Sequence, residues 1–302
     1  MGRSAHHRHR TTGLAALVLA VCLVAVPGAL PATGGDSPLP PAFGEFQQGP
    51  DGGTVWEGRI PNAFVRHATR PTVVYLPPGF SALDRYPVVY FLQGFRGSPF
   101  QYVSGIGLAR VADELIAAHE ISPFVAVIPP AGLTVRYDGE WTGVWENYLV
   151  DDVVPWTERH LPVAAGMHAR ILAGLSAGGY GAVDIGIRHP RLFGTLESWS
   201  GSFAAPHDGS LRHATAAQLA AHDPVLLVPR EAEQLHRLGT RFFLSAGMRD
   251  RGAFREAIAF SAELSSLRIP HRLWLGPGGH NGRFWASQLA PALRYALAPP
   301  SL

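Results

Sequence analysis

The sequence has no lysine and only one cysteine, so all 25 of its basic residues are arginines. Without lysine, the chain has no Schiff-base lysine, P-loop lysine or Ser–Lys dyad. Cys22 lies inside an N-terminal apolar run, so a chain that loses this run has no thiol nucleophile, disulfide, zinc ribbon or Fe–S cluster. A nucleophile must therefore come from Ser, Thr, Asp, Glu, His or Tyr.

The first 32 residues have the order of segments that is typical of an export signal. Three arginines precede an apolar run over residues 13–26, and a proline and small residues follow. The run is short for a membrane span, so we expect residues 1–32 to be a cleaved signal peptide, with a retained anchor as the alternative. Residues 33–53 are rich in Pro and Gly and predict a linker. We expect a secreted or cell-wall-associated protein with no stable membrane insertion after cleavage.

The basic character of the chain comes largely from this leader. Residues 1–32 contain three arginines and no acid, so the remainder has 22 arginines against 23 acids, a formal charge of −1. No basic stripe remains along the sequence. We therefore expect no nucleic-acid partner.

From residue 54 onward, short apolar strands alternate with amphipathic helices. The expected strands are 54–60, 72–76, 87–92, 124–128, 169–175, 194–199, 241–246 and 271–275, and the expected helices are 108–119, 147–160, 177–188, 253–267 and 283–297. This alternation predicts the α/β class, with a mostly parallel central sheet, helices on both faces and one domain over residues 54–302. Pro155 predicts a kink or break in its helix. Residues 201–238 have no clear strand and are expected to cap the site.

The strongest chemical signal surrounds Ser176. A predicted strand runs into Gly174-Leu175-Ser176-Ala177-Gly178, and a predicted helix follows. This is the context of a nucleophile elbow, in which small residues two before and two after the serine avoid backbone clashes. We predict that Ser176 is the nucleophile; the alternative is a glycine-rich strand–helix turn without chemistry.

A serine nucleophile needs a base, and that base needs an acid that orients it. His280 lies in a Gly-rich loop after the last predicted strand, while other histidines lie in the leader, at predicted helix ends or within residues 201–238. Asp250 ends the loop after the strand 241–246. The order Ser176, Asp250, His280 is that of the α/β-hydrolase fold.

Asp250 also has structural alternatives, which are to cap the following helix or to pair with Arg249 or Arg251. Asp223 is the second candidate for the acid. For the oxyanion hole, the helix N-terminus after Ser176 offers the Ala177 N–H, and the loop after the strand 87–92 offers the Phe95 N–H beside Gly94.

An aromatic cluster lies between these motifs. Tyr137, Trp141, Trp145 and Tyr148 are interspersed with Asp138, Glu140 and Glu146. These aromatics line either an acyl or sugar pocket, or the edge of the core with solvated acids around it.

At these residues the chain resembles the esterase family of α/β-hydrolases that includes antigen 85 mycolyltransferases, bacterial feruloyl esterases and S-formylglutathione hydrolases. Residues 90–96, Tyr-Phe-Leu-Gln-Gly-Phe-Arg, are similar to the antigen 85 segment ending in Leu-Leu-Asp-Gly-Leu-Arg, and residues 145–148, Trp-Glu-Asn-Tyr, to its Trp-Glu-Thr-Phe helix. The elbow and His280 followed by Trp285 also match. The resemblance implies Phe95 and Ala177 as oxyanion donors, with Arg96 and Trp285 as substrate-binding residues.

Two departures from antigen 85 shift the expected substrate. Gln93 stands where antigen 85 has an Asp linked to trehalose, and Asp250 stands in for its Glu acid. We therefore expect a secreted serine esterase or acyltransferase that acts on a small-molecule or cell-envelope ester, without metal or cofactor. The alternatives are a mycolyltransferase-type acyltransferase and a non-catalytic cell-wall-binding protein on the same fold.

Overall fold

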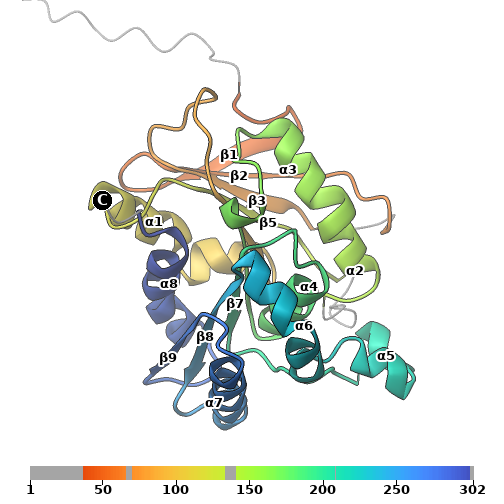
Figure 1. Ribbon diagram of the computed structural model, residues 1–302. Helices are drawn as coiled ribbons and strands as arrows, with labels where there is room; N and C mark the ends of the chain where they lie inside the picture. Colours follow the sequence, from red (N-terminus) through yellow and green to blue (C-terminus); the bar gives the residue numbers. More distant parts are fainter. Residues whose placement is uncertain (1–36, 66–69, 133–140, 208, 300–302) are drawn as a thin grey trace, which may run out of the picture. The chain divides into compact units, whose positions relative to one another are not determined.

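The computed structural model describes residues 37–65, 70–132, 141–207 and 209–299 (Figure 1). The predicted signal peptide, and with it Cys22, lies outside the described residues. The strands are β1 (Phe43–Gln48), β2 (Thr54–Gly58), β3 (Thr72–Leu76), β4 (Val88–Leu92), β5 (Val125–Ile128), β6 (Arg170–Leu175), β7 (Thr195–Trp199), β8 (Arg241–Gly247) and β9 (His271–Gly276). The α-helices are α1 (Leu108–Ala117), α2 (Val144–Asn147), α3 (Val154–His160), α4 (Ala177–Arg188), α5 (Ala216–Ala220), α6 (Pro224–Leu238), α7 (Arg251–Ser266) and α8 (Gly282–Leu297).

The described strands form one sheet in the order β1-β2-β3-β5-β4-β6-β7-β8-β9. The first three strands pair antiparallel, and β3 also pairs antiparallel with β5. From β5 to β9 every neighbouring pair is parallel. The chain therefore has the α/β-hydrolase fold, and the carboxyl ends of β4, β6, β7, β8 and β9 meet at one edge of the sheet, where ligands bind in such sheets.

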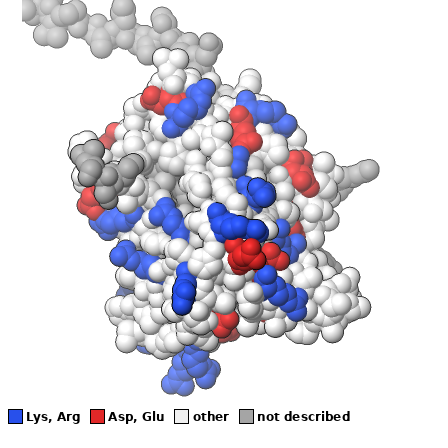
Figure 2. All heavy atoms as spheres, in the orientation of Figure 1, with Lys and Arg blue, Asp and Glu red and all other residues white. Residues whose placement is uncertain are grey.

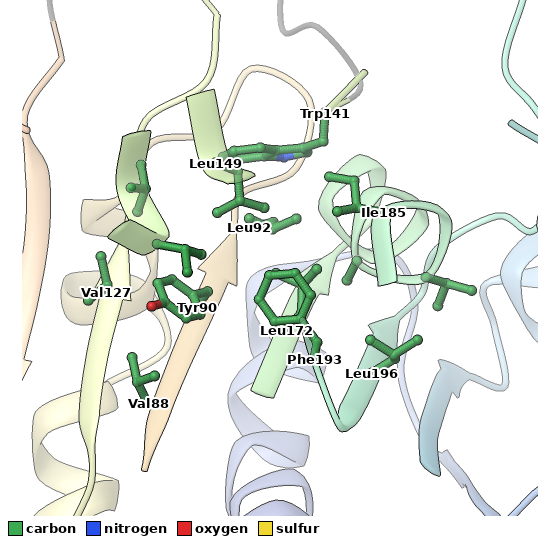
Figure 3. Close-up of a cluster of buried hydrophobic side chains, with 14 of the residues drawn as sticks. Val88, Tyr90, Leu92, Val127, Trp141, Leu149, Leu172, Ile185, Phe193 and Leu196 are labelled. Carbon is green, nitrogen blue, oxygen red and sulfur yellow. The ribbon is translucent and has the colours of Figure 1, made fainter. Parts of the chain in front are cut away.

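The sheet is buried on both faces, which explains why its central strands have no polar face. In β4, Val88, Tyr90 and Leu92 point into one hydrophobic cluster, and Val89 and Phe91 point into the other. The first cluster is closed by α3, α4, α6 and α7, the second by α1 and α8. Figure 3 shows the first cluster, in which Tyr90 of β4 lies beside Phe193. Continuous apolar strands are what a sheet covered on both faces requires.

One stretch of the predicted linker is a strand. Residues 43–48 form β1, which pairs with β2 at the edge of the sheet, so the linker assignment to residues 33–53 is wrong for this segment. Only Phe43 of β1 is buried, and its ring stacks on Trp156 with 5.1 Å between the centroids. An edge strand with one buried residue shows no alternation that sequence reasoning would detect.

The helix predicted for 147–160 is divided into three pieces. The α-helix α2 passes into a π-helical stretch at Tyr148–Val153, and α3 starts at Val154 with Pro155 in its first turn. The backbone stays right-handed helical through Val153 and Val154, on either side of the junction between the π-helical stretch and α3. The irregularity that Pro155 predicted therefore takes the form of a π-helical stretch just before it, without a break in the helical backbone.

The described helices include none that is long and apolar enough to cross a membrane. On the face shown in Figure 2, basic and acidic side chains are interspersed rather than separated into patches of one sign.

Candidate active site

Ser176 occupies a sharp turn between β6 and α4, and its backbone is in the left-handed half of the Ramachandran plot. Its φ is 54° and its ψ is −121°, and its N–H donates to the Trp199 carbonyl at 2.8 Å. A Cβ on Gly174 would lie 2.1 Å from the Gly178 carbonyl oxygen, and a Cβ on Gly178 would lie 2.0 Å from that of Leu92. Gly174 is therefore required for the turn to close on itself, and Gly178 for the turn to pack against the end of β4.

His280 joins Ser176 to Asp250. The distance from His280 Nε2 to Ser176 Oγ is 2.8 Å, and that from His280 Nδ1 to Asp250 Oδ2 is 2.6 Å. The ring of Trp285 lies edge-on to the imidazole, with 5.2 Å between the centroids. In this arrangement the carboxylate accepts Nδ1–H and leaves the Nε2 lone pair directed at the serine hydroxyl.

The two candidate acids differ in what their side chains do. Asp250 stands at the N-cap position of α7, but its side chain makes no capping hydrogen bond; it binds His280 instead. Asp223 caps α6 by accepting the Leu226 N–H at 3.2 Å. The structure therefore brings Asp250 to the histidine and gives Asp223 a structural position.

The loop after β4 passes close to Ser176. A turn is closed by the Gly97 N–H and the Gly94 carbonyl at 2.9 Å, with Arg96 at φ 59°. A Cβ on Gly94 would lie 2.8 Å from Leu175 Cδ1 and 3.1 Å from Ser176 Cβ, so the small size of glycine favours this close approach. Among the described residues, the N–H groups of Phe95 and Ala177 have no recorded acceptor, and both residues border the space beside Ser176.

Two clefts meet at Ser176. The first has a volume of about 590 Å³ and the second about 370 Å³, and Phe95, Ser176 and His280 line both. The first is completed by Arg70, Pro71, Gly94, Arg96, Gly97, Ser98, Pro99, Phe100, Gln101, Leu175 and Trp285. The second is completed by Ala177, Ser200, Gly201, Ser202, Asp250, Ala253 and Glu256.

Both residues that the resemblance assigned to substrate line the first cleft. Arg96 is exposed and its guanidinium lies 5.3 Å from the centre of the Phe95 ring. Trp285 is 7 % exposed, and its indole Nε1 donates to Ser200 Oγ at 3.3 Å. Trp285 therefore forms a fixed wall beside His280.

Gln93, by contrast, lines neither cleft. It is fully buried, its side-chain amide donates to the Ala131 carbonyl at 3.0 Å, and its own carbonyl accepts the Trp141 indole N–H at 2.9 Å. At the position where antigen 85 has its Asp, this chain therefore has a buried glutamine whose side chain binds backbone and does not reach the clefts.

The aromatic cluster belongs to the core. Trp141, Trp145 and Tyr148 are each less than 5 % exposed, while Tyr137, Asp138 and Glu140 lie outside the described residues. Glu146 is not a solvated acid, because it pairs with Arg188 and with His189 Nε2 at 2.7 Å. Burial acts to raise the pKa of Glu146, but these two partners outweigh it and lower the pKa below its ordinary value.

Several residues of the clefts escaped the sequence analysis, among them Arg70 and Ser200. Arg70 precedes β3 and has no motif that links it to Ser176 in sequence. Ser200 directly follows β7, and its position at the carboxyl end of a parallel strand was a usable signal. Residues 201–238, which were expected to cap the site, do so only in small part. Of the described residues in this range, only Gly201 and Ser202 line the two clefts, and α6 packs against α4.

Among the residues that the structure describes, no group of three or more His, Cys, Asp and Glu side chains is arranged to hold a metal ion.

Comparison with known proteins gives one consistent result. The profile of the family described as "Putative esterase" matches residues 67–296. The endo-1,4-beta-xylanase/feruloyl esterase of Xylanibacter ruminicola is 32 % identical over 45 % of this chain, and the match spans 20 % of that protein. The MPT51/MPB51 antigen of Mycobacterium bovis is 27 % identical over 65 % of this chain and 70 % of its own length. A solved ferulic acid esterase, 23 % identical, superimposes with a TM-score of 0.70 over 81 % of this chain and 98 % of its own.

Proposed function

Because this chain belongs to that esterase family, we propose that it is a serine carboxylic-ester hydrolase with Ser176 as nucleophile, His280 as base and Asp250 as the acid that orients it. The observation that carries the proposal is the continuous hydrogen-bonded line from Asp250 Oδ2 through His280 to Ser176 Oγ, at 2.6 and 2.8 Å. Hydrogen-bond reach between nucleophile, base and orienting acid is the geometric requirement for covalent acyl transfer.

The chemistry proceeds in two halves. Ser176 Oγ attacks the carbonyl carbon while its proton passes to His280 Nε2, and the carbonyl oxygen becomes an oxyanion that the Phe95 and Ala177 N–H groups stabilise. The C–O bond to the alcohol then breaks, and the leaving alkoxide takes the proton from His280. Water, deprotonated by His280, attacks the acyl-enzyme, and the acid leaves as Ser176 Oγ regains its proton.

The direct test uses a fluorophosphonate probe and short p-nitrophenyl esters on the purified protein. We expect covalent labelling and ester turnover in the wild type and neither in Ser176→Ala. Ser266→Ala, which removes an exposed hydroxyl at the end of α7, is the matched control and should keep both. Labelling of Ser176→Ala at the wild-type level would refute the assignment of the nucleophile.

The His280 side chain is exposed to solvent, so water is the default acceptor of the acyl group. Transfer to an alcohol requires that an acceptor displace water from the acyl-enzyme. Glycerol and trehalose, added to the ester assay with product analysis by mass spectrometry, should leave free acid as the main product; a dominant new ester would instead define an acyltransferase.

We propose further that the chain is exported and that residues 1–32 are removed. The support is the order of an arginine-bearing start, an apolar run and small residues in the sequence. Expression of the full chain in a bacterium, with mass spectrometry of the protein in the medium, should show a new N-terminus near residue 33. Retention of residues 1–32 in the membrane fraction would favour an anchor.

A further inference from the structure

The two clefts beside Ser176 carry opposite charge. Arg70 and Arg96 line the first cleft, and no Asp or Glu is among its lining residues. Asp250 and Glu256 line the second cleft, and no Arg is among its lining residues. Ser176 thus lies between a cleft lined by arginines and a cleft lined by acidic residues.

The two arginines of the first cleft have no acidic partner among the described residues. The arginines that do form ion pairs in the described structure lie outside this cleft, such as Arg170 with Glu158 and Arg188 with Asp184. Arg70 donates instead to the carbonyl of Gly97, and Arg96 lies over the ring of Phe95. A carbonyl and an aromatic ring orient a guanidinium without neutralising it.

Two unneutralised guanidinium groups on one concave wall repel each other, and this repulsion is relieved when an anion binds between them. Arginine is suited to this, because its planar fork forms paired hydrogen bonds with carboxylate or phosphate. Both groups are fixed to the same turn, residues 94–97, which also carries the Phe95 N–H. An anion held there is therefore positioned relative to the oxyanion site.

We propose that the first cleft selects esters that carry an anionic group, a carboxylate or a phosphate, which Arg70 and Arg96 bind while Ser176 attacks the ester carbonyl. This substrate class rests on the proposed function of Ser176. The acidic second cleft excludes the anion from the other side of the nucleophile, so the charge pattern fixes the direction in which the ester lies.

The test compares kcat/KM for matched anionic and neutral esters, after subtraction of the rate with Ser176→Ala. One pair places the charge on the acyl side, 4-nitrophenyl hemiglutarate against 4-nitrophenyl pentanoate. The other pair places it on the alcohol side, the butyrate of 4-hydroxybenzoate against that of 4-hydroxybenzamide. We expect the anionic ester to be preferred in one pair, and that pair identifies which half of the substrate occupies the first cleft.

The variants locate the effect. Arg96→Gln should lower the anionic-to-neutral ratio about fivefold, and Arg70→Gln/Arg96→Gln should lower it further. Arg191→Gln removes the same charge from the loop between α4 and β7, at the opposite edge of the sheet, and should leave the ratio unchanged. The preference should also weaken in high salt. A ratio of one or less in both pairs, or a ratio that Arg96→Gln does not change, would overturn the proposal.

A binding measurement separates this proposal from that of the esterase activity. Calorimetry with glutarate on the Ser176→Ala protein should detect binding that Arg96→Gln weakens and Arg191→Gln does not. Failure of every ester to turn over, together with such binding, would refute the proposed reaction and keep the anion site. Turnover of neutral esters with no glutarate binding would refute the anion site and keep the reaction.

Discussion

At the scale of single residues, Asp250 has a choice between two hydrogen-bonding partners. It stands at the start of α7, where aspartate ordinarily caps the helix, yet its side chain is committed to His280. The N-terminus of α7 therefore does without a side-chain cap, a device that contributes about 1 kcal/mol elsewhere. Because the Asp250 carboxylate binds His280 instead of capping α7, it is placed to orient the imidazole rather than to stabilise the helix.

Asp250→Asn should separate these roles. The amide is nearly isosteric but no longer favours the tautomer with a proton on Nδ1, so we expect kcat to fall by about 10² to 10⁴ with little change in the urea midpoint. Asp223→Asn is the control, since Asn also caps helices, and it should retain activity. Full activity in Asp250→Asn would show that the acid lies elsewhere.

The glycines of the elbow give a second prediction at this scale. Gly178→Ala would bring a methyl group to 2.0 Å from a backbone oxygen, so we expect it to destabilise the fold by about 3 kcal/mol or more and to abolish turnover. Gly252→Ala, in the first turn of α7, meets nothing within 4 Å and should be neutral or stabilise by up to about 1 kcal/mol. Urea unfolding of both variants measures the difference; equal midpoints would contradict it.

Sequence motifs identified the candidate site residues that are recognised from the residues adjacent to them in the chain. Gly174, Ser176 and Gly178 are read from one turn, and His280 from the loop that precedes α8. Arg70 depends on a contact with Gly97 across 27 positions, and no local pattern encodes such a contact.

At the scale of elements, buried ion pairs fasten α2, α4 and the segment before α6 to one another. Asp184 is fully buried in α4 and binds Arg188 and His222 Nδ1, the latter at 3.0 Å, while Glu146 of α2 binds Arg188 and His189. Removing one member of such a group leaves an uncompensated charge inside the protein. These contacts hold α4, the helix that follows Ser176, against its neighbours.

The first strand and the turn after it give a prediction at this scale. Asp113 of α1 is fully buried, and its carboxylate accepts the N–H groups of Asp51 and Gly53 at 3.0 Å and the Tyr75 hydroxyl at 2.7 Å. A chain that begins at Thr54 loses both N–H donors and β1. We expect it to be several kcal/mol less stable than a chain that begins at Ser37.

Thermal unfolding of the two shortened chains measures this difference. Equal melting temperatures would mean that residues 37–53 contribute nothing to the fold. The sequence predicted the other strands because they are apolar throughout or alternate, whereas β1 has a single buried side chain among Pro- and Gly-rich neighbours. The π-helical stretch before α3 was missed for a related reason, since its residues also fit an ordinary helix.

At the scale of the whole molecule, two buried carboxyl groups make stability depend on pH in opposite directions. Burial raises the pKa of Glu197 to about 8, against the weaker opposing effects of the Trp199 indole and the Arg241 charge. The folded protein therefore holds a proton between about pH 4.5 and 8 that the unfolded chain releases. In this range the contribution of Glu197 to stability falls as pH rises, by at most about 1.4 kcal/mol per pH unit.

Glu197→Gln should remove this dependence. The difference in unfolding free energy between variant and wild type should increase in favour of the variant from pH 5 to pH 8, as urea titrations at several pH values measure. Glu146 acts in the other direction: its pKa is lowered, so its contribution is present at neutral pH and is lost as pH falls below about 4.5. If the difference in unfolding free energy between Glu197→Gln and wild type stays constant with pH, the raised pKa of Glu197 is contradicted.

The backbone at Ser176 has a consequence for how this sequence can change. A φ of 54° is costly for serine and nearly free for glycine, so glycine at this position would relieve strain and raise the melting temperature. Laboratory evolution that rewards heat resistance alone would therefore favour a more stable protein that lacks the Ser176 hydroxyl. Screens for hardier variants should score turnover in every round, since the strain at the elbow persists only while selection demands the hydroxyl.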